Sequence, residues 1–160
     1  MSKSVRRVER AASDLGLDIN VRRTGESTRT AEDAALACGC DVPQIVKSLI
    51  FRGCETVDLI LLLVSGANQV DMDLAPDAVG EHLERADAAE VRARTGFAIG
   101  GVAPIGHLET PRILLDETLL QVSTVWAAAG APDAVFEVPP DVLARATKAK
   151  VARFAKINPQ

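Results

Sequence analysis

This chain of 160 residues has few aromatic residues and no excess of positive charge. Four Phe, one Trp and no Tyr are present, too few for a protein that binds single-stranded nucleic acid by stacking bases on aromatic side chains. The 18 Lys and Arg residues are outnumbered by 22 Asp and Glu, and the net charge of -4 argues against a surface coated in positive charge. The remaining composition, 48% apolar and 25% charged residues, is typical of one globular domain.

Signals for export and for a membrane are also missing. The longest apolar run covers residues 59–64, whereas a membrane-spanning helix needs about 20 apolar residues. No apolar stretch of roughly 7–15 residues follows the basic N-terminus, as it would in a secretion signal. The three cysteines are an odd number, and without a secretion signal they indicate reduced thiols. The sequence therefore predicts a cytoplasmic protein without a membrane partner.

The common catalytic signatures are absent as well. The sequence contains no HExxH zinc motif, no paired CxxC, no GxSxG elbow and no P-loop. Cys38 and Cys40 are separated by one residue, which is not the spacing of a redox or zinc pair. The histidines are His82 and His107, and His82 lies in a polar segment that we expect at the surface. We therefore expect neither a metal ion nor an organic cofactor.

Charged residues are unevenly distributed along the chain. Residues 1–30 hold seven Lys and Arg against four Asp and Glu, residues 31–146 hold seven against eighteen, and residues 147–160 hold four against none. The two basic ends are either solvated surfaces or a local binding site for a polyanion, because phosphate binding depends on local rather than total charge. The candidate contacts are Arg6, Arg7, Arg22, Arg23, Lys148, Lys150 and Arg153.

Helical and strand patterns alternate irregularly along the sequence. Apolar residues at helical spacing predict a first helix that ends at Gly16, and Thr30 begins a second helix that ends at Gly39. Residues 58–65 are nearly all apolar, which predicts a buried strand paired as a hairpin with residues 46–52. We expect further helices over 73–83, 87–95 and from 139, and strands over 18–23, 97–99, 112–115, 119–121 and 134–138, with 124–129 open between strand and helix. This mixture predicts a single α/β domain with a mixed sheet over residues 1–160.

A glycine-rich loop is the first candidate for chemistry. Residues 100–107 contain three glycines, one proline and one histidine directly after the predicted strand 97–99. Glycine allows the backbone to approach a ligand closely, and consecutive N–H groups in such a loop can bind an anion. An ordinary turn that needs glycine explains the same pattern.

Lys47 is the second candidate. No other Lys or Arg occurs between Arg29 and Arg52, and Lys47 stands near the start of an apolar strand. It is either a surface charge at the end of the strand or a point charge directed into a pocket, where it would attract a phosphate or carboxyl group.

Together these features resemble the YbaK/ProX family of aminoacyl-tRNA editing domains, which is related to the insertion domain of prolyl-tRNA synthetase. The resemblance covers nearly the whole chain. It rests on the segment that begins at Thr30, the strand around Lys47, the Gly-x-x-x-Pro loop from Gly100 to Pro104, and residues 129–136. It implies a compact α/β domain in which helices surround a curved, barrel-like mixed β-sheet.

The resemblance also implies a reaction, hydrolysis of the ester that joins a wrong amino acid to the 3′ end of a tRNA. The chain would be a free-standing deacylase acting on tRNA(Pro) that carries a small amino acid such as Ala or Cys. Its partners would be the tRNA acceptor end and prolyl-tRNA synthetase, not DNA. The implied catalytic residues are Lys47, Gly100 and Gly101, and the implied substrate-binding residues are Pro104, Gly106, His107, Asp116 and Gly130.

Two points qualify this interpretation. Many relatives have Ala-Gly-His-Pro where this chain has Ala129, Gly130, Ala131 and Pro132, so the resemblance leaves the preferred amino acid open. An ordinary lysine pKa of about 10.4 makes Lys47 a cation that positions the substrate rather than a base. The alternative function is a non-catalytic module of the same fold that binds tRNA or a synthetase.

Overall fold

A buried hairpin, made of strands β2 (Val46–Gly53) and β3 (Leu59–Ser65), forms the centre of the fold. All of β3 is buried, because other elements cover both faces of the sheet. The computed structural model describes residues 2–26, 28 and 30–158. The other strands are β1 (Arg22–Arg23), β4 (Asn68–Val70), β5 (Leu83–Arg85), β6 (Arg112–Asp116), β7 (Val125–Ala128), β8 (Ala134–Val138), β9 (Lys150–Ala152) and β10 (Ala155–Ile157). The helices are α1 (Lys3–Asp14), α2 (Ala31–Cys38), η1 (Val42–Gln44), α3 (Ala75–Val79), α4 (Ala88–Thr95), η2 (Glu117–Gln121) and α5 (Pro140–Thr147).

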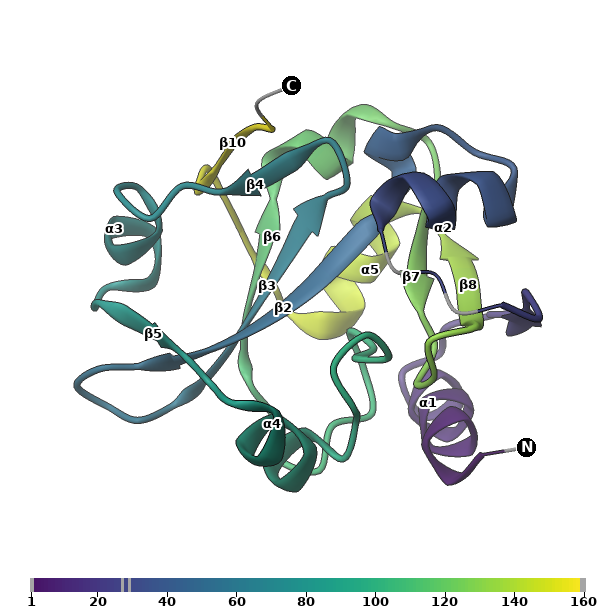
Figure 1. Ribbon diagram of the computed structural model, residues 1–160, viewed down its shortest axis with the longest axis horizontal. Coiled ribbons are helices and arrows are strands. Elements are labelled where there is room, and N and C mark those ends of the chain that lie inside the picture. The colour runs from purple at the N-terminus through teal and green to yellow at the C-terminus, as the bar shows by residue number, and fades with distance from the viewer. Residues whose placement is uncertain (1, 27, 29, 159–160) are drawn as a thin grey trace.

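The main sheet has the strand order β5-β2-β3-β6-β9. Strand β2 is antiparallel to β3 and β5, whereas β6 is parallel to both β3 and β9. The sheet is mixed because the chain leaves β3, passes through β4, α3, β5 and α4, and returns to β6 in the same direction (Figure 1). A three-stranded sheet, β1-β8-β7, and a pair, β10-β4, complete the strand pairing of the described residues.

The main sheet and the three-stranded sheet meet where β2 contacts β7, at a bridge between Ile45 and Trp126. Between them lies the largest cluster of buried apolar side chains, which includes Leu61, Leu63 and Phe136. A second apolar cluster covers the opposite face of the main sheet, against α3. The predicted single α/β domain with a mixed sheet is confirmed. In the described part of the chain, the strands form three separate sheets, and this bridge joins the main sheet to the three-stranded one.

Helix α1 packs under the turn between β7 and β8 (Figure 1). The hydroxyl of Ser2 accepts a hydrogen bond from the Val5 N–H and caps the helix, and Val5, Val8 and Ala12 are buried. The amphipathic pattern of the sequence therefore predicted this helix correctly. No helix in the described ranges is long and apolar enough to cross a membrane.

Four local predictions differ from the structure. Of the strand expected over 18–23, only Arg22–Arg23 forms a strand, β1. The helix expected over 73–83 ends as α3 at Val79, since Gly80 adopts a left-handed conformation and the chain continues into β5. The strand expected over 97–99 is irregular, because the Phe97 N–H bonds to the Thr95 hydroxyl instead of to a neighbouring strand. The strand expected over 119–121 is the 3-10 helix η2, which Asp116 caps through the Thr118 N–H. The ambiguous segment 124–129 forms β7.

Candidate functional site

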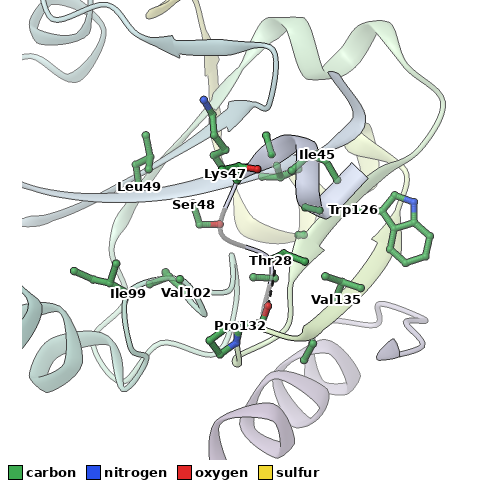
Figure 2. Close-up of a pocket in the computed structure, with 18 residues that line it drawn as sticks. Thr28, Ile45, Lys47, Ser48, Leu49, Ile99, Val102, Trp126, Pro132 and Val135 are labelled. Carbon is green, nitrogen blue, oxygen red and sulfur yellow. Dashed lines mark hydrogen bonds between the residues drawn. The ribbon is translucent and has the colours of Figure 1, made fainter. Parts of the chain in front are cut away.

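A cavity of about 300 Å3 lies between β2, β7 and α2, with the loop 99–102 closing one side (Figure 2). Most of its wall is apolar and consists of small or branched side chains. Of the described residues that line it, Lys47 alone carries a charge, and the other polar side chains belong to Thr28, Thr30 and Ser48. Such a cavity fits a small, uncharged group attached to a polar one.

Lys47 lines this cavity, but its amine points to the other side of β2 from Ser48 (Figure 2). Consecutive residues of a strand project to opposite faces, and the Lys47 Nζ donates a hydrogen bond to the Asn68 carbonyl on β4. Burial lowers the pKa of Lys47, and the nearby carboxylates of Glu32 and Asp116 act in the opposite direction. The Lys47 residue therefore lines the cavity, while the Asn68 carbonyl holds its amine on the opposite side of β2.

Asp116 lies beneath this lysine rather than in the cavity. Its carboxylate is buried and accepts hydrogen bonds from the Ser65 N–H, the Asn68 side-chain amide and the Thr118 N–H. Because Asn68 also provides the carbonyl that holds Lys47, Asp116 fixes the position of the lysine through Asn68. Its predicted contact with the substrate remains a prediction.

The glycine-rich loop contributes Gly100 to the cavity, whereas Gly101 and Pro104 are buried outside the lining. Gly100 has a φ of 94°, which a glycine adopts without the strain of other residues. The Gly101 N–H already donates to the Ala98 carbonyl, and its Cα faces the backbone of Ala131. Of the two glycines predicted to be catalytic, the structure brings only Gly100 together with Lys47.

Gly106 and His107 pack against α1 and the core. The Gly106 carbonyl accepts a hydrogen bond from the Arg7 Nε at 2.6 Å. The His107 ring meets Phe97 edge-on, with 5.4 Å between ring centroids, and its Nε2 is buried without a hydrogen-bond partner among the described residues. Burial is the main cause that lowers the pKa of His107 to about 4, so the imidazole is neutral near pH 7. Neither residue lines the cavity.

Gly130 is a contact point between α1 and the turn after β7. Its φ is 100°, and a Cβ at this position would lie 2.7 Å from the Ser4 carbonyl oxygen. The hydroxyl of Ser4 donates to the Gly130 carbonyl at 2.6 Å. The pattern that suggested a substrate contact is thus explained locally by close packing, and Gly130 is not part of the cavity wall.

Ser48 is a lining residue that the sequence reasoning missed. Its Oγ is buried and has no hydrogen-bond partner among the described residues. The alternation of Val46, Ser48 and Ile50 on one side of β2 was a usable signal, because it places a single hydroxyl on an otherwise apolar face.

The two ends of the chain lie apart. Figure 1 shows α1 and β10 on opposite sides of the molecule. Several of the candidate cations are engaged within the fold: Arg7 bonds to Gly106 and lies 4.7 Å from the ring centre of Phe97, Arg23 pairs with Asp133, and Lys150 donates to Ala78.

The cysteines are three free thiols at Cys38, Cys40 and Cys54. Burial is the main cause that raises the pKa of Cys40 to about 11 and that of Cys38 in the same direction, which keeps both protonated and unreactive near neutral pH. Within the described ranges, no group of three or more His, Cys, Asp or Glu side chains is placed to hold a metal ion.

Comparison with known proteins decides the family. Residues 25–146 match the aminoacyl-tRNA editing domain. The chain belongs to this family. Membership confirms the predicted family and the predicted class of activity, aminoacyl-tRNA editing. The match includes every residue that lines the cavity.

Individual relatives agree with this assignment. The uncharacterized protein YwhH of Bacillus subtilis is 34% identical over 125 residues, which is 78% of this chain and 79% of YwhH. EbsC of Enterococcus faecalis, a candidate Cys-tRNA(Pro)/Cys-tRNA(Cys) deacylase, is 26% identical over 130 residues, 81% of this chain and 79% of EbsC. The crystal structure of a candidate trans-editing enzyme for prolyl-tRNA synthetase has a TM-score of 0.91 and 46% identity, covering 98% of this chain and 99% of that one.

Proposed function

We propose that this editing domain is a free-standing deacylase that hydrolyses mischarged tRNA(Pro) carrying a small amino acid such as alanine or cysteine. The observation that supports this most is the mainly apolar cavity of about 300 Å3 that Lys47 helps to line. The editing unit spans residues 1–160, acts in the cytoplasm on the tRNA acceptor end, and cooperates with prolyl-tRNA synthetase.

The shape of the cavity suits the logic of editing. A synthetase site discriminates weakly against a smaller amino acid, because one methylene contributes only about 1–3 kcal/mol. A second site that admits only small side chains removes such errors. Ala34, Ala127 and Ala134 form part of the wall together with Ile45 and Val135, so the wall offers an alanyl or cysteinyl side chain apolar contact without a charge.

The reaction needs little catalytic machinery, since an aminoacyl ester is already activated. Water attacks the ester carbonyl, the bond to the ribose oxygen breaks, and the ribose hydroxyl leaves with a proton. We assign Lys47 to electrostatic positioning of the substrate, because it is the charged residue among the described residues that line the cavity. The Gly100 N–H accounts for stabilisation of the developing oxyanion, since the Gly101 N–H is already bonded to Ala98.

A deacylation panel tests the proposal. Purified protein is incubated with tRNA(Pro) charged with Ala, Cys, Ser, Thr or Pro, and the remaining aminoacyl-tRNA is measured over time. We expect fast hydrolysis of Ala- or Cys-tRNA(Pro) and on the order of 100-fold slower hydrolysis by Lys47→Ala. Lys156→Ala, at an exposed lysine of β10, is the matched control and should act as the wild type does. A folded Lys47→Ala variant with full activity would contradict the assigned role.

The position of the Lys47 amine also favours a second candidate, a non-catalytic module of the same fold. Its hydrogen bond to Asn68 directs it away from the cavity side of β2, and a module that only binds tRNA or a synthetase needs no cation at a reacting carbonyl. Binding of every charged tRNA in the panel without hydrolysis of any would establish this candidate and overturn the deacylase.

A further inference from the structure

A second cavity of about 190 Å3 adjoins the first one. The two cavities share a wall made of Ser48 and Leu49 on β2 and of Ile99, Gly100 and Val102 in the glycine-rich loop. The second cavity extends along β2 to Arg85 on β5, an exposed side chain that lines it. The surface around the shared wall therefore offers two adjacent compartments, one edged by Lys47 and the other by Arg85.

The shared wall contains one polar side-chain atom, the Ser48 Oγ, among the described residues that form it. This atom is buried and makes no hydrogen bond within the described ranges. A buried hydroxyl without a hydrogen-bond partner destabilises the folded protein. A bound molecule that hydrogen-bonds to this hydroxyl would remove that cost. In Figure 2 the Ser48 side chain lies on the same side of β2 as Val102, opposite the amine of Lys47.

We propose that the Ser48 hydroxyl hydrogen-bonds the ester group of the substrate, where the two cavities meet. This inference rests on the proposed deacylase function. An aminoacyl-tRNA end has two parts joined by one ester, and two adjoining cavities hold them with the ester at the shared wall. The aminoacyl group occupies the larger, mostly apolar cavity. The terminal nucleotide occupies the second cavity, where the Arg85 guanidinium suits its phosphate.

The role of Ser48 is to orient the ester and not to attack it. A serine nucleophile needs an adjacent base, and no described side chain bonds to the Ser48 hydroxyl. As a donor it would act together with the N–H of Gly100, a residue of the same shared wall. Both donors act on the carbonyl oxygen, which gains negative charge when water attacks.

Three variants test this inference. Ser48→Thr keeps the hydroxyl. Ser48→Val has the shape of threonine but carries a methyl group in place of the hydroxyl. Ser48→Ala removes the hydroxyl. For each variant, kcat and KM are measured on the aminoacyl-tRNA that the wild type hydrolyses fastest, and the melting temperature is measured without substrate. We expect kcat to fall on the order of 100-fold in Ser48→Val and Ser48→Ala and to stay within a few-fold of the wild type in Ser48→Thr.

The melting temperature separates this role from a structural one. Because the hydroxyl has no partner in the free protein, Ser48→Ala should melt at the same temperature as the wild type or higher, although it is much slower. A lower melting temperature of Ser48→Ala, or equal kcat in Ser48→Thr and Ser48→Val, would overturn the inference alone. A wild-type protein that hydrolyses no charged tRNA would instead overturn the proposed function, and the inference with it.

Discussion

Lowering the pH should destabilise the fold through one side chain, His107. The imidazole is enclosed by Phe97 and by the backbone of Ala103, and the Arg7 guanidinium lies nearby. Burial lowers the pKa of His107 from 6.5 to about 4; the hydrogen bond with Ala103 opposes this shift, and the charge of Arg7 adds to it. Protonation of His107 in the folded state therefore leaves a cation buried beside another cation.

The sign and size of the effect follow from these pKa values. Above pH 6.5 the imidazole is neutral in both states and contributes no pH dependence. Between pH 6.5 and about 4 the unfolded chain binds a proton that the folded chain does not, so the free energy of unfolding decreases as the pH falls. With about 1.36 kcal/mol per pH unit, the loss attributable to His107 reaches about 3 kcal/mol at pH 4.

The assay is urea unfolding of the wild type and His107→Asn at a series of pH values from 7.5 to 4. The asparagine amide can keep a donor near the Ala103 backbone but does not titrate. The wild type should lose about 3 kcal/mol more than His107→Asn over this range, and His82→Asn, at the exposed histidine, should behave as the wild type. Equal pH dependence of the wild type and His107→Asn would refute the reasoning.

Two further predictions concern stability. The Gly130→Ala substitution should lower the free energy of unfolding by on the order of 2 kcal/mol, because φ is 100° and the new Cβ meets the Ser4 backbone. Gly16→Ala, at a glycine with positive φ but open space around it, is the control in urea unfolding. An equal loss in both variants would contradict the importance of the contact with Ser4. Glu81, whose pKa is lowered to about 2 mainly by the Thr56 N–H, contributes stability that is lost as the pH falls from about 4.5 toward 2. Glu81→Gln should therefore have a lower melting temperature than Glu9→Gln at pH 7, and its melting temperature should fall less between pH 7 and acid. Thermal scans of both variants at the two pH values measure this. Equal melting temperatures at pH 7 and an equal fall in acid would contradict the prediction.

The centre of the fold could be predicted because it depends on local pattern. The segment of β3 is apolar at nearly every position, so it does not show the pattern of an amphipathic helix. Its pairing with β2 across a short turn follows from their proximity in the sequence. The strands β9 and β10 were not predicted, since each has three residues, exposes most of them and pairs with a segment far away in the sequence. Nothing local distinguishes such strands from a loop.

The site could be predicted only in part for a similar reason. Lys47 stands out by charge, and Gly100 belongs to a recognisable loop. The alternation along β2 groups Ser48 with Val46 and Ile50, but it does not show that this face adjoins a cavity. Apolar clusters cover both faces, and only the folded sheets show where the packing leaves space. The family resemblance implied that Gly130 and His107 bind the substrate, and the sequence alone does not show that α1 packs against Gly130 and Phe97 against His107.

Helix α1 connects two loops that are distant in sequence. Arg7 holds the carbonyl of Gly106 at the end of the glycine-rich loop, and Ser4 holds the carbonyl of Gly130 in the turn before β8. The glycine-rich loop forms one wall of the cavity, and β7 and β8 form part of another. A shift of α1 would therefore move both walls together. A fragment cut to residues 25–146 would keep every lining residue yet lose the support that sets the width of the cavity.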